Sequence, residues 1–498
     1  MIFKTHSTVK SLFLACLFAG LLAAPALAFE HFISRDGHQL KDGNEVFRFA
    51  GIHAPELHRI EDQARGKCLD DPRGWGQYFK WPTAQEQENW IQSLVLTGHK
   101  AMRVYVLSIA TQWDQACERE THILPPNTAD GMPRLNEAAM VHYDRMIALA
   151  DKHGLRLILP FVDHWKWWGG RNDLAAFYGE HEDDFYDINS KTYAAYQSII
   201  KQVTGRTNTF TGRKYNEEKA IMAWETGNEL KLSNESFVRT TATLIKHQAP
   251  NQLVIDGTYL KVNEFSLSDP NVDIITNHFY TVNGNNNPEQ ILKDLKAING
   301  KKVYFIGEFG LDSAARLNSI MQAAVHQQYN GAQAAGALFW HFRGHRHDGG
   351  YYWHKEVTGH YAYHLPGSPE NYRNEEMAMA DGARLAIAQM DGAQQMQPLP
   401  VPQAPVLRPI DTPNNFKWLG APVGRWYRFE RAMREDGPWQ IIGDGISDGR
   451  NGFNPATDTL FADPMPRQAG QTYFYRVIAF NETGQSIPSN IETYTQPE

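Results

Sequence analysis

The chain has 498 residues, of which 42% are hydrophobic and 12% aromatic, so it can form a large core and is too long for one small domain. Its formal net charge of −8 at pH 7 argues against nucleic acid or an anionic membrane surface as a partner. This composition is typical of a globular protein with more than one domain.

Residues 1–28 have the pattern of a secretory signal peptide. Lys4 and Lys10 precede an apolar run at residues 12–24, and residues 26–28 read Ala-Leu-Ala, which fits a small-x-small cleavage site. The apolar run is too short to span a bilayer well, and no later stretch resembles a transmembrane helix. We therefore expect a secreted protein, either extracellular or periplasmic, with no membrane partner.

Two cysteines, Cys68 and Cys117, follow this segment. Cysteines of exported proteins often form disulfides. A disulfide needs Cα atoms about 4.4–6.8 Å apart, and a sequence cannot place them. The sequence therefore leaves open whether Cys68 and Cys117 form a disulfide.

Residues 29–392 alternate between short β-rich runs and longer amphipathic segments. The predicted strands are residues 46–53, 101–108, 156–164, 221–229, 253–259, 272–280, 303–310 and 336–345. The predicted helices are residues 84–97, 137–153, 191–203, 236–247, 288–298, 316–329 and 375–390. Eight strands with intervening helices predict an α/β fold, a (β/α)8 TIM barrel. The alternative is a doubly wound sheet, but no Gly-rich phosphate loop opens any of the helices.

A Pro/Gln-rich linker at residues 393–405 separates this part from residues 406–498, where the pattern changes to short alternating strands. We expect a small all-β sandwich there. With Trp418, the strand at 426–431 and Tyr473 as a corner tyrosine, it resembles a fibronectin type III module. The module could bind carbohydrate or pack beside the barrel as a spacer. We expect no hydrogen bond of the barrel to depend on it.

Two glutamates stand where predicted strands run into loops. Glu229 ends the run Ala-Ile-Met-Ala-Trp-Glu-Thr-Gly-Asn-Glu, and Glu308 follows Val-Tyr-Phe-Ile-Gly. Glutamate is rarely buried unless it is paired, and barrel active sites lie at the carboxyl ends of the strands. Two such carboxylates predict an acid/base pair that cleaves a glycosidic bond. Glu225, on the same side of its strand, is expected to be buried and structural.

The barrel also carries longer motifs that support this interpretation. They are Arg103 in Met-Arg-Val-Tyr, His164-Trp165-Lys166-Trp167-Trp168-Gly169-Gly170, Asn228-Glu229, His278-Phe279-Tyr280, Ile306-Gly307-Glu308-Phe309-Gly310 and Trp340. With these motifs, residues 40–345 resemble glycoside hydrolase family 5, and within it the endo-β-1,4-mannanase-like branch. Three departures from that branch are Lys231 in place of an Arg, His53 in place of an Asn, and a His-rich loop after the eighth strand.

The resemblance implies a retaining enzyme that cleaves β-1,4-mannan-type polysaccharide or oligosaccharide, with Glu229 as acid/base and Glu308 as nucleophile. The implied substrate-binding residues are Arg103, His164, Trp165, Trp168, Asn228, His278, Tyr280 and Trp340. No cofactor is implied, and the His spacing matches no tight metal motif. The expected state is a monomer. Alternatives are an exo-β-mannosidase or β-1,4-glucanase of the same fold, or a non-catalytic carbohydrate-binding protein.

Overall fold

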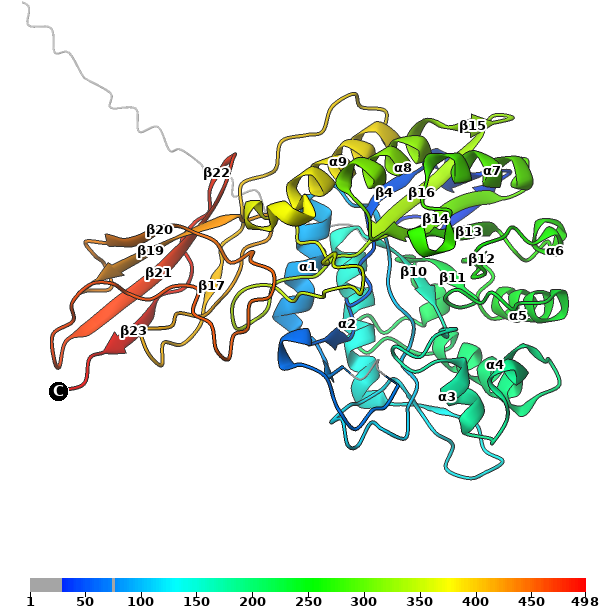
Figure 1. The fold of residues 1–498 in the computed structure, drawn as a ribbon, viewed down its shortest axis with the longest axis horizontal. Coiled ribbons are helices and arrows are strands. Elements are labelled where there is room, and N and C mark those ends of the chain that lie inside the picture. The colour runs from blue at the N-terminus through cyan, green and yellow to red at the C-terminus, as the bar shows by residue number, and fades with distance from the viewer. Residues whose placement is uncertain (1–28, 74–76) are drawn as a thin grey trace, which may run out of the picture.

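The computed structural model describes residues 29–73 and 77–498 as two units side by side, an α/β barrel and a smaller antiparallel β unit (Figure 1). The predicted signal peptide, residues 1–28, lies outside the described residues. Among the described helices, none combines the length and the apolar character that a membrane crossing requires.

Eight parallel strands form the barrel, which confirms the predicted fold class. They are β4 (Phe49–Ile52), β7 (Ala101–Arg103), β10 (Arg156–Pro160), β11 (Ile221–Glu225), β12 (Leu253–Asp256), β13 (Ile274–Phe279), β14 (Val303–Gly310) and β16 (Ala332–Trp340). The order runs from β7 through β10 to β14 and β16, and β16 pairs with β4. The Ala54 N–H donates to the Arg103 carbonyl at 3.2 Å and brings β4 to β7, so the sheet is nearly closed.

Helices cover the outside of the barrel, and seven of the described helices lie where the sequence predicts them (Figure 1). They are α1 (Ala84–Leu96), α2 (Glu137–His153), α3 (Arg171–Ala176), α4 (Lys191–Thr204), α5 (Glu235–Gln248), α6 (Glu264–Ser268), α7 (Pro288–Ile298), α8 (Ala314–His326) and α9 (Glu376–Met390). The short α3 and α6 were not predicted. The helix predicted to reach residue 329 ends at His326, because Gln328–Tyr329 form β15 and pair with β16.

The first predicted strand, 46–53, is two strands in the structure. β3 (Glu45–Phe47) belongs to an antiparallel sheet with β1 (Ile33–Asp36) and β2 (Gln39–Asp42), whereas β4 enters the barrel. Ile33, Leu40 and Phe47 from this unpredicted sheet pack with apolar residues of the barrel strands. The sheet therefore covers the amino ends of the barrel strands and leaves the carboxyl ends uncovered by it.

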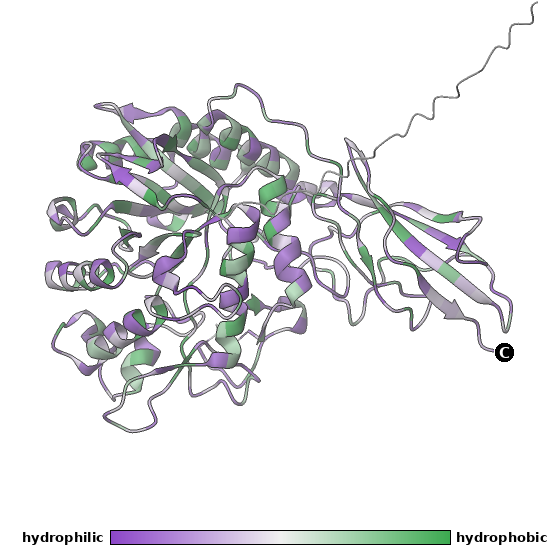
Figure 2. Ribbon diagram, turned by 180° about the vertical axis from the view of Figure 1, so that it is seen from behind, coloured by the Kyte–Doolittle hydropathy of each residue, from purple (hydrophilic) through white to green (hydrophobic). Residues whose placement is uncertain are grey.

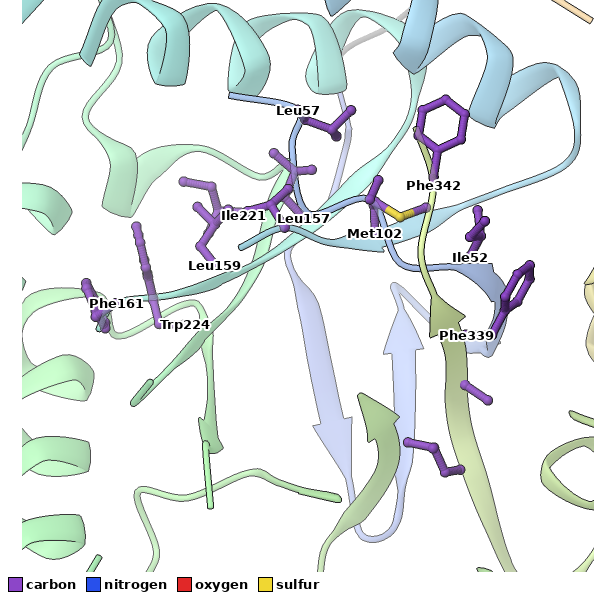
Figure 3. Close-up of a cluster of buried hydrophobic side chains, with 14 of the residues drawn as sticks. Ile52, Leu57, Met102, Leu157, Leu159, Phe161, Ile221, Trp224, Phe339 and Phe342 are labelled. Carbon is purple, nitrogen blue, oxygen red and sulfur yellow. The ribbon is translucent and has the colours of Figure 1, made fainter. Parts of the chain in front are cut away.

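Strand alternation divides the apolar core into two layers. Ala101, Ile158 and Ala223 point into the barrel and pack with the N-terminal sheet. Their neighbours Met102, Leu157 and Trp224 point outward against the helices. Figure 3 shows this outer cluster lying between the strands and the helices.

Loops at the carboxyl ends of the first strands are held together by a disulfide. Cys68 and Cys117 are bonded, with their Cα atoms 5.5 Å apart, so the paired alternative is the one the structure has. The same region contains two small antiparallel pairs, β5 (Ile60–Glu61) with β6 (Phe79–Lys80) and β8 (Ile123–Leu124) with β9 (Arg134–Leu135).

The C-terminal unit is antiparallel, as expected. Its main sheet joins β20 (Gln440–Ile446), β19 (Trp426–Ala432), β21 (Thr472–Asn481), β22 (Gly484–Gln485) and β23 (Glu492–Thr495), and β17 (Val406–Leu407) pairs with β18 (Trp418–Leu419). The strands of this unit carry both hydrophobic and hydrophilic residues (Figure 2), and partly exposed and buried residues alternate over residues 472–477 of β21. The Tyr473 hydroxyl accepts a hydrogen bond from the Gln468 backbone N–H at 2.8 Å, the contact expected of a corner tyrosine.

The two units share buried hydrogen bonds, so the expectation that no hydrogen bond of the barrel depends on the C-terminal unit is wrong. Asn89 in α1 donates through Nδ2 to the Gly420 carbonyl at 2.7 Å, and Asn371 donates to the Gly449 carbonyl at 2.7 Å. Both asparagines are buried. Removal of the C-terminal unit breaks both hydrogen bonds, and each contributes about 0.5–1.5 kcal/mol to stability.

We therefore predict that a protein ending at residue 395 aggregates or has a lower thermal midpoint than the full chain. The measurement is differential scanning calorimetry of both proteins, with soluble yield recorded. The control is the full chain carrying Asn481→Ala, because Asn481 donates to Pro400 and Val423 and to nothing in the barrel. Equal midpoints for the truncated and the full chain would contradict the prediction.

Candidate active site

The polar centre of the barrel lies one layer above its apolar interior. Arg103 and Glu225 each follow an inward-facing alanine, Ala101 and Ala223, by two positions. Successive inward residues of a strand are two positions apart, so both side chains point into the barrel at the carboxyl ends of β7 and β11. Arg103 and Glu225 are fully buried.

Arg103 uses every N–H of its guanidinium. Nε donates to Glu225 at 2.6 Å, and Nη2 donates to Glu225 at 3.1 Å and to Asn228 Oδ1 at 2.9 Å. Nη1 donates to Glu308 at 2.6 Å and contacts His53 Nε2 at 2.9 Å. Burial lowers the pKa of Arg103, but the carboxylates of Glu225 and Glu308 outweigh it and raise that pKa. The structure thus confirms Glu225 as a buried structural residue: it fixes the guanidinium that holds Glu308.

Glu308 is held at both carboxylate oxygens. Oε1 accepts from Arg103, and Oε2 accepts from the Tyr280 hydroxyl at 2.7 Å. Burial raises the pKa of Glu308 above its usual value, while His278 and Arg103 oppose that rise. Two donors aimed at one carboxylate favour its ionised, nucleophilic form and fix its direction.

Glu229 has a different environment. Its Oε2 accepts from Trp165 Nε1 at 2.5 Å, and its Oε1 contacts His278 Nδ1 at 2.9 Å. Burial raises the pKa of Glu229 to about 7, against the smaller opposing effects of Trp165, Arg103 and Lys231. The backbone φ of Glu229 is +53°, a left-handed conformation that costs about 1–3 kcal/mol. This turn directs the side chain across the barrel toward Glu308.

His278 lies between the two glutamates. Its Nδ1 is 2.9 Å from a Glu229 oxygen and 3.5 Å from a Glu308 oxygen. Burial lowers the pKa of His278 to about 4, so the ring is neutral at pH 7. A Cβ on Gly307 would come within 2.7 Å of His278 Nε2, so β14 needs a glycine immediately before Glu308.

Asn228 is bound on both sides of its amide. Its Oδ1 accepts from Arg103, and its Nδ2 donates to Asp163 Oδ1 at 2.9 Å. Asp163 also accepts from the Tyr105 hydroxyl at 2.7 Å, and burial raises the pKa of Asp163 to about 6. Sequence reasoning missed Asp163 and Tyr105, although Tyr105 follows Arg103 by two positions and so shares its side of the chain.

The two glutamates lie close together. Single oxygens of Glu229 and Glu308 and a nitrogen of His278 all lie within 4.8 Å of one another. Such a group could hold a cation, but hydrogen-bond donors already occupy both carboxylates. Retaining glycosidases separate their carboxyl groups by about 5–5.5 Å, whereas inverting ones need roughly 6.5–9.5 Å.

An aromatic wall borders the glutamates. Trp340 packs 5.0 Å from His53 and 6.0 Å from Trp167, measured between ring centroids. Trp167 is 9% exposed and donates through Nε1 to Glu61 at 2.5 Å. Trp168, which the resemblance implies as a substrate-binding residue, is only 1% exposed, because it packs against Tyr105, His58 and Phe79 within the wall.

A cleft of about 630 Å³ reaches Trp165, whose indole donates to Glu229. It is lined by Arg73, His164, Trp165, Lys166, Arg171, Glu182, Asp183, Lys231 and Leu232. The predicted binding residues His164 and Trp165 therefore lie at the cleft. The Lys231 ammonium is 4.9 Å from the Trp165 ring, so the residue that replaces the expected Arg still reaches this cleft.

Comparisons with known proteins match part of this chain to glycoside hydrolases. Residues 91–307 match the sequence model of a family described as GH family 5 beta-mannosidase-like. The mannan endo-1,4-beta-mannosidase F of Aspergillus clavatus is 32% identical over 175 residues, which is 32% of this chain and 36% of that protein. The Aspergillus fumigatus mannan endo-1,4-beta-mannosidase F is 30% identical over 282 residues, 50% of this chain and 56% of that protein. The chain thus spans about a third to a little over half the length of these relatives.

Solved structures share the fold. A glycoside hydrolase family 5 mannosidase from Rhizomucor miehei superposes with a TM-score of 0.54 at 17% identity and covers 73% of this chain and 99% of its own. The endo-beta-1,4-mannanase from Thermotoga petrophila gives a TM-score of 0.54 at 17% identity and covers 91% and 98%. At this identity the likeness shows the barrel fold alone.

The contacts of Arg103 predict that its loss destabilises the protein more than the joint loss of Arg103 and Glu225. Arg103→Met should lower the free energy of unfolding by about 3–5 kcal/mol, because Glu225 is then buried without a cation. Arg103→Met combined with Glu225→Met should regain much of that loss, because no unpaired charge remains on this side.

Urea unfolding of the three proteins measures these differences. The control is Arg65→Met, which removes an exposed ion pair with Glu118 and should change stability by at most about 1 kcal/mol. A double variant as unstable as Arg103→Met would contradict the pairing account.

Proposed function

We propose that this protein is a retaining β-glycoside hydrolase that cleaves β-1,4-linked mannan-type chains by double displacement. The observation that carries the proposal is a pair of buried glutamates at the carboxyl ends of β11 and β14, close together but in different environments. The similarity to mannan endo-1,4-beta-mannosidases supports the choice of sugar.

In the first step, the Glu308 carboxylate attacks the anomeric carbon while Glu229 gives its proton to the leaving glycosidic oxygen. The bond from the anomeric carbon to that oxygen breaks, and a glycosyl ester to Glu308 forms. The contacts of Arg103 and Tyr280 aim the attacking carboxylate. The raised pKa of Glu229 keeps it protonated near neutral pH.

In the second step, Glu229 is a carboxylate and takes a proton from water. The water oxygen bonds to the anomeric carbon, the ester to Glu308 breaks, and the sugar leaves with its original anomeric configuration. His278, neutral and between the two glutamates, contacts Glu229 and helps to fix the direction of its carboxylate. The enzyme returns to its starting protonation state.

The matched family description, beta-mannosidase-like, favours a second candidate. In that case the enzyme releases single sugars from chain ends rather than cutting within the chain. Both candidates use the same two glutamates and the same retaining chemistry.

We also propose where the enzyme is located and what kind of module its C-terminal residues form. The signal-peptide pattern of residues 1–28 and the Cys68–Cys117 disulfide support secretion into an oxidising compartment. The Tyr473 corner contact supports a fibronectin type III-like module at residues 406–498.

Product analysis tests the proposed function. The wild-type protein should release oligosaccharides from mannan, or mannose from mannobiose in the second candidate, and should act far more slowly on cellulose. Glu308→Ala should reduce turnover below about 1% of wild type, because nucleophile loss removes the covalent route. The matched control is Glu264→Ala in α6, outside the site. Full activity of Glu308→Ala would overturn its role.

The pH dependence should follow Glu229. The value of kcat/KM should fall as pH rises through about 7, because Glu229 then loses the proton it must donate. The folded state keeps this proton above the usual pKa of 4.5, so the contribution of Glu229 to stability should decrease between about pH 4.5 and pH 7.

Glu229→Ala tests this assignment with two substrates. An aryl β-mannoside with a good leaving group needs little protonation, so formation of its glycosyl-enzyme should survive and lose the alkaline decline. Natural glycans should lose about 10²–10⁴-fold in rate. Equal losses on both substrates would mean that another group is the acid.

A further inference from the structure

The loop after β16, residues 341–368, lies between the active site and the C-terminal unit, residues 406–498, which is called the C-terminal domain from here on (Figure 1). On the active-site side, Glu356 accepts from Trp340 Nε1 at 2.9 Å. Trp340 belongs to the aromatic wall beside the glutamates, so Glu356 sets the direction of its indole ring.

A second contact anchors the same loop to Glu61 of β5. His354 contacts Glu61 at 3.1 Å and Glu356 at 3.6 Å. Burial lowers the pKa of His354, but the two carboxylates outweigh it and raise that pKa to about 10, so the ring is a cation at neutral pH. The His354 cation therefore bridges the carboxylates of Glu61 and Glu356. Glu61 also accepts a hydrogen bond from Trp167 Nε1.

The residue next to His354 points to the other domain. Trp353 donates through Nε1 to the Phe453 carbonyl at 2.8 Å. The Phe453 ring lies directly on Gly350 of the loop, where a Cβ would come within 2.5 Å of Cδ1. Adjacent residues of one loop segment thus contact the C-terminal domain and the active-site wall.

The contacts continue along the loop. His345 is fully buried, with its Nε2 3.6 Å from Asp448 of the C-terminal domain and its Nδ1 3.0 Å from Asn89 of α1. Arg408 of the C-terminal domain donates to the His347 carbonyl at 2.6 Å. The loop is therefore bound to the C-terminal domain at several points.

We propose that Trp353 is a positioning residue through which the C-terminal domain holds Glu356, and thereby Trp340, in the geometry that the substrate site needs. This inference rests on the proposed hydrolase function. It makes the C-terminal domain a part of the active-site scaffold rather than a spacer.

The test compares Trp353→Phe with Trp439→Phe in the full chain. Trp353→Phe keeps a ring but removes the N–H that donates to Phe453. Trp439→Phe is the matched control, because the Trp439 ring contacts Arg476 within the C-terminal domain. With an aryl β-mannoside, well below the melting temperature, Trp353→Phe should lower kcat/KM by about 10-fold, and the control should not. Equal kcat/KM for both variants would overturn the proposal.

A double-mutant cycle distinguishes positioning from general destabilisation. If Trp353 acts through Glu356, then Trp353→Phe should lower kcat/KM no further in a Glu356→Ala background. Multiplicative losses in the double variant would overturn the proposed route.

Hydrogen exchange provides a readout that needs no activity. The Glu356 N–H bonds the His360 carbonyl at 2.8 Å, and the Ala362 N–H bonds the His354 carbonyl at 2.9 Å. Both amides should exchange faster in Trp353→Phe than in wild type and remain protected in Trp439→Phe. Unchanged exchange would overturn the proposal. If the wild-type protein hydrolyses no glycoside, but the two amides still exchange faster in Trp353→Phe than in wild type, the hydrolase function alone is refuted.

Discussion

The site is organised around one buried cation. Arg103 has five N–H groups, and all of them are bound within the barrel, to Glu225, Asn228, His53 and Glu308. A guanidinium removed from water is stable only when its charge and its donors are matched, so these partners have little freedom to move. The position of Glu308 follows from this requirement. Glu225 accepts only from Nε and Nη2 of Arg103, and Glu308 supplies the carboxylate that accepts from Nη1.

The two reactive glutamates differ through their contacts. Glu308 has a cation and a hydroxyl as donors, whereas Glu229 has an indole N–H and a neutral imidazole. A full positive charge favours an ionised carboxylate much more strongly than neutral donors do. The same barrel layer can therefore hold one glutamate as the nucleophile and the other as the proton donor, as the proposed mechanism requires.

Sequence patterns predicted the barrel because alternation of apolar residues and helix periodicity are local properties. They also predicted that Glu229 and Glu308 form a pair, because the carboxyl ends of barrel strands converge. They did not predict the burial of Trp168, since a tryptophan in a loop motif gives no sign of whether its ring faces solvent or the wall. Glu356 left no signal, because its loop has no periodicity. The domain contact was missed because a polar residue on a helix, such as Asn89, resembles a solvent-facing one until its partner is placed.

The most direct test of the account is to trap the covalent intermediate. A 2-deoxy-2-fluoro-β-mannosyl fluoride slows both steps, because the fluorine at C2 destabilises the oxocarbenium-like transition state, while the good leaving group still allows attack. Peptide mass spectrometry after incubation should find the fluorosugar attached to the peptide that contains Glu308, with fluoride released. An adduct on another residue, or hydrolysis with inverted configuration and no adduct, would contradict the account.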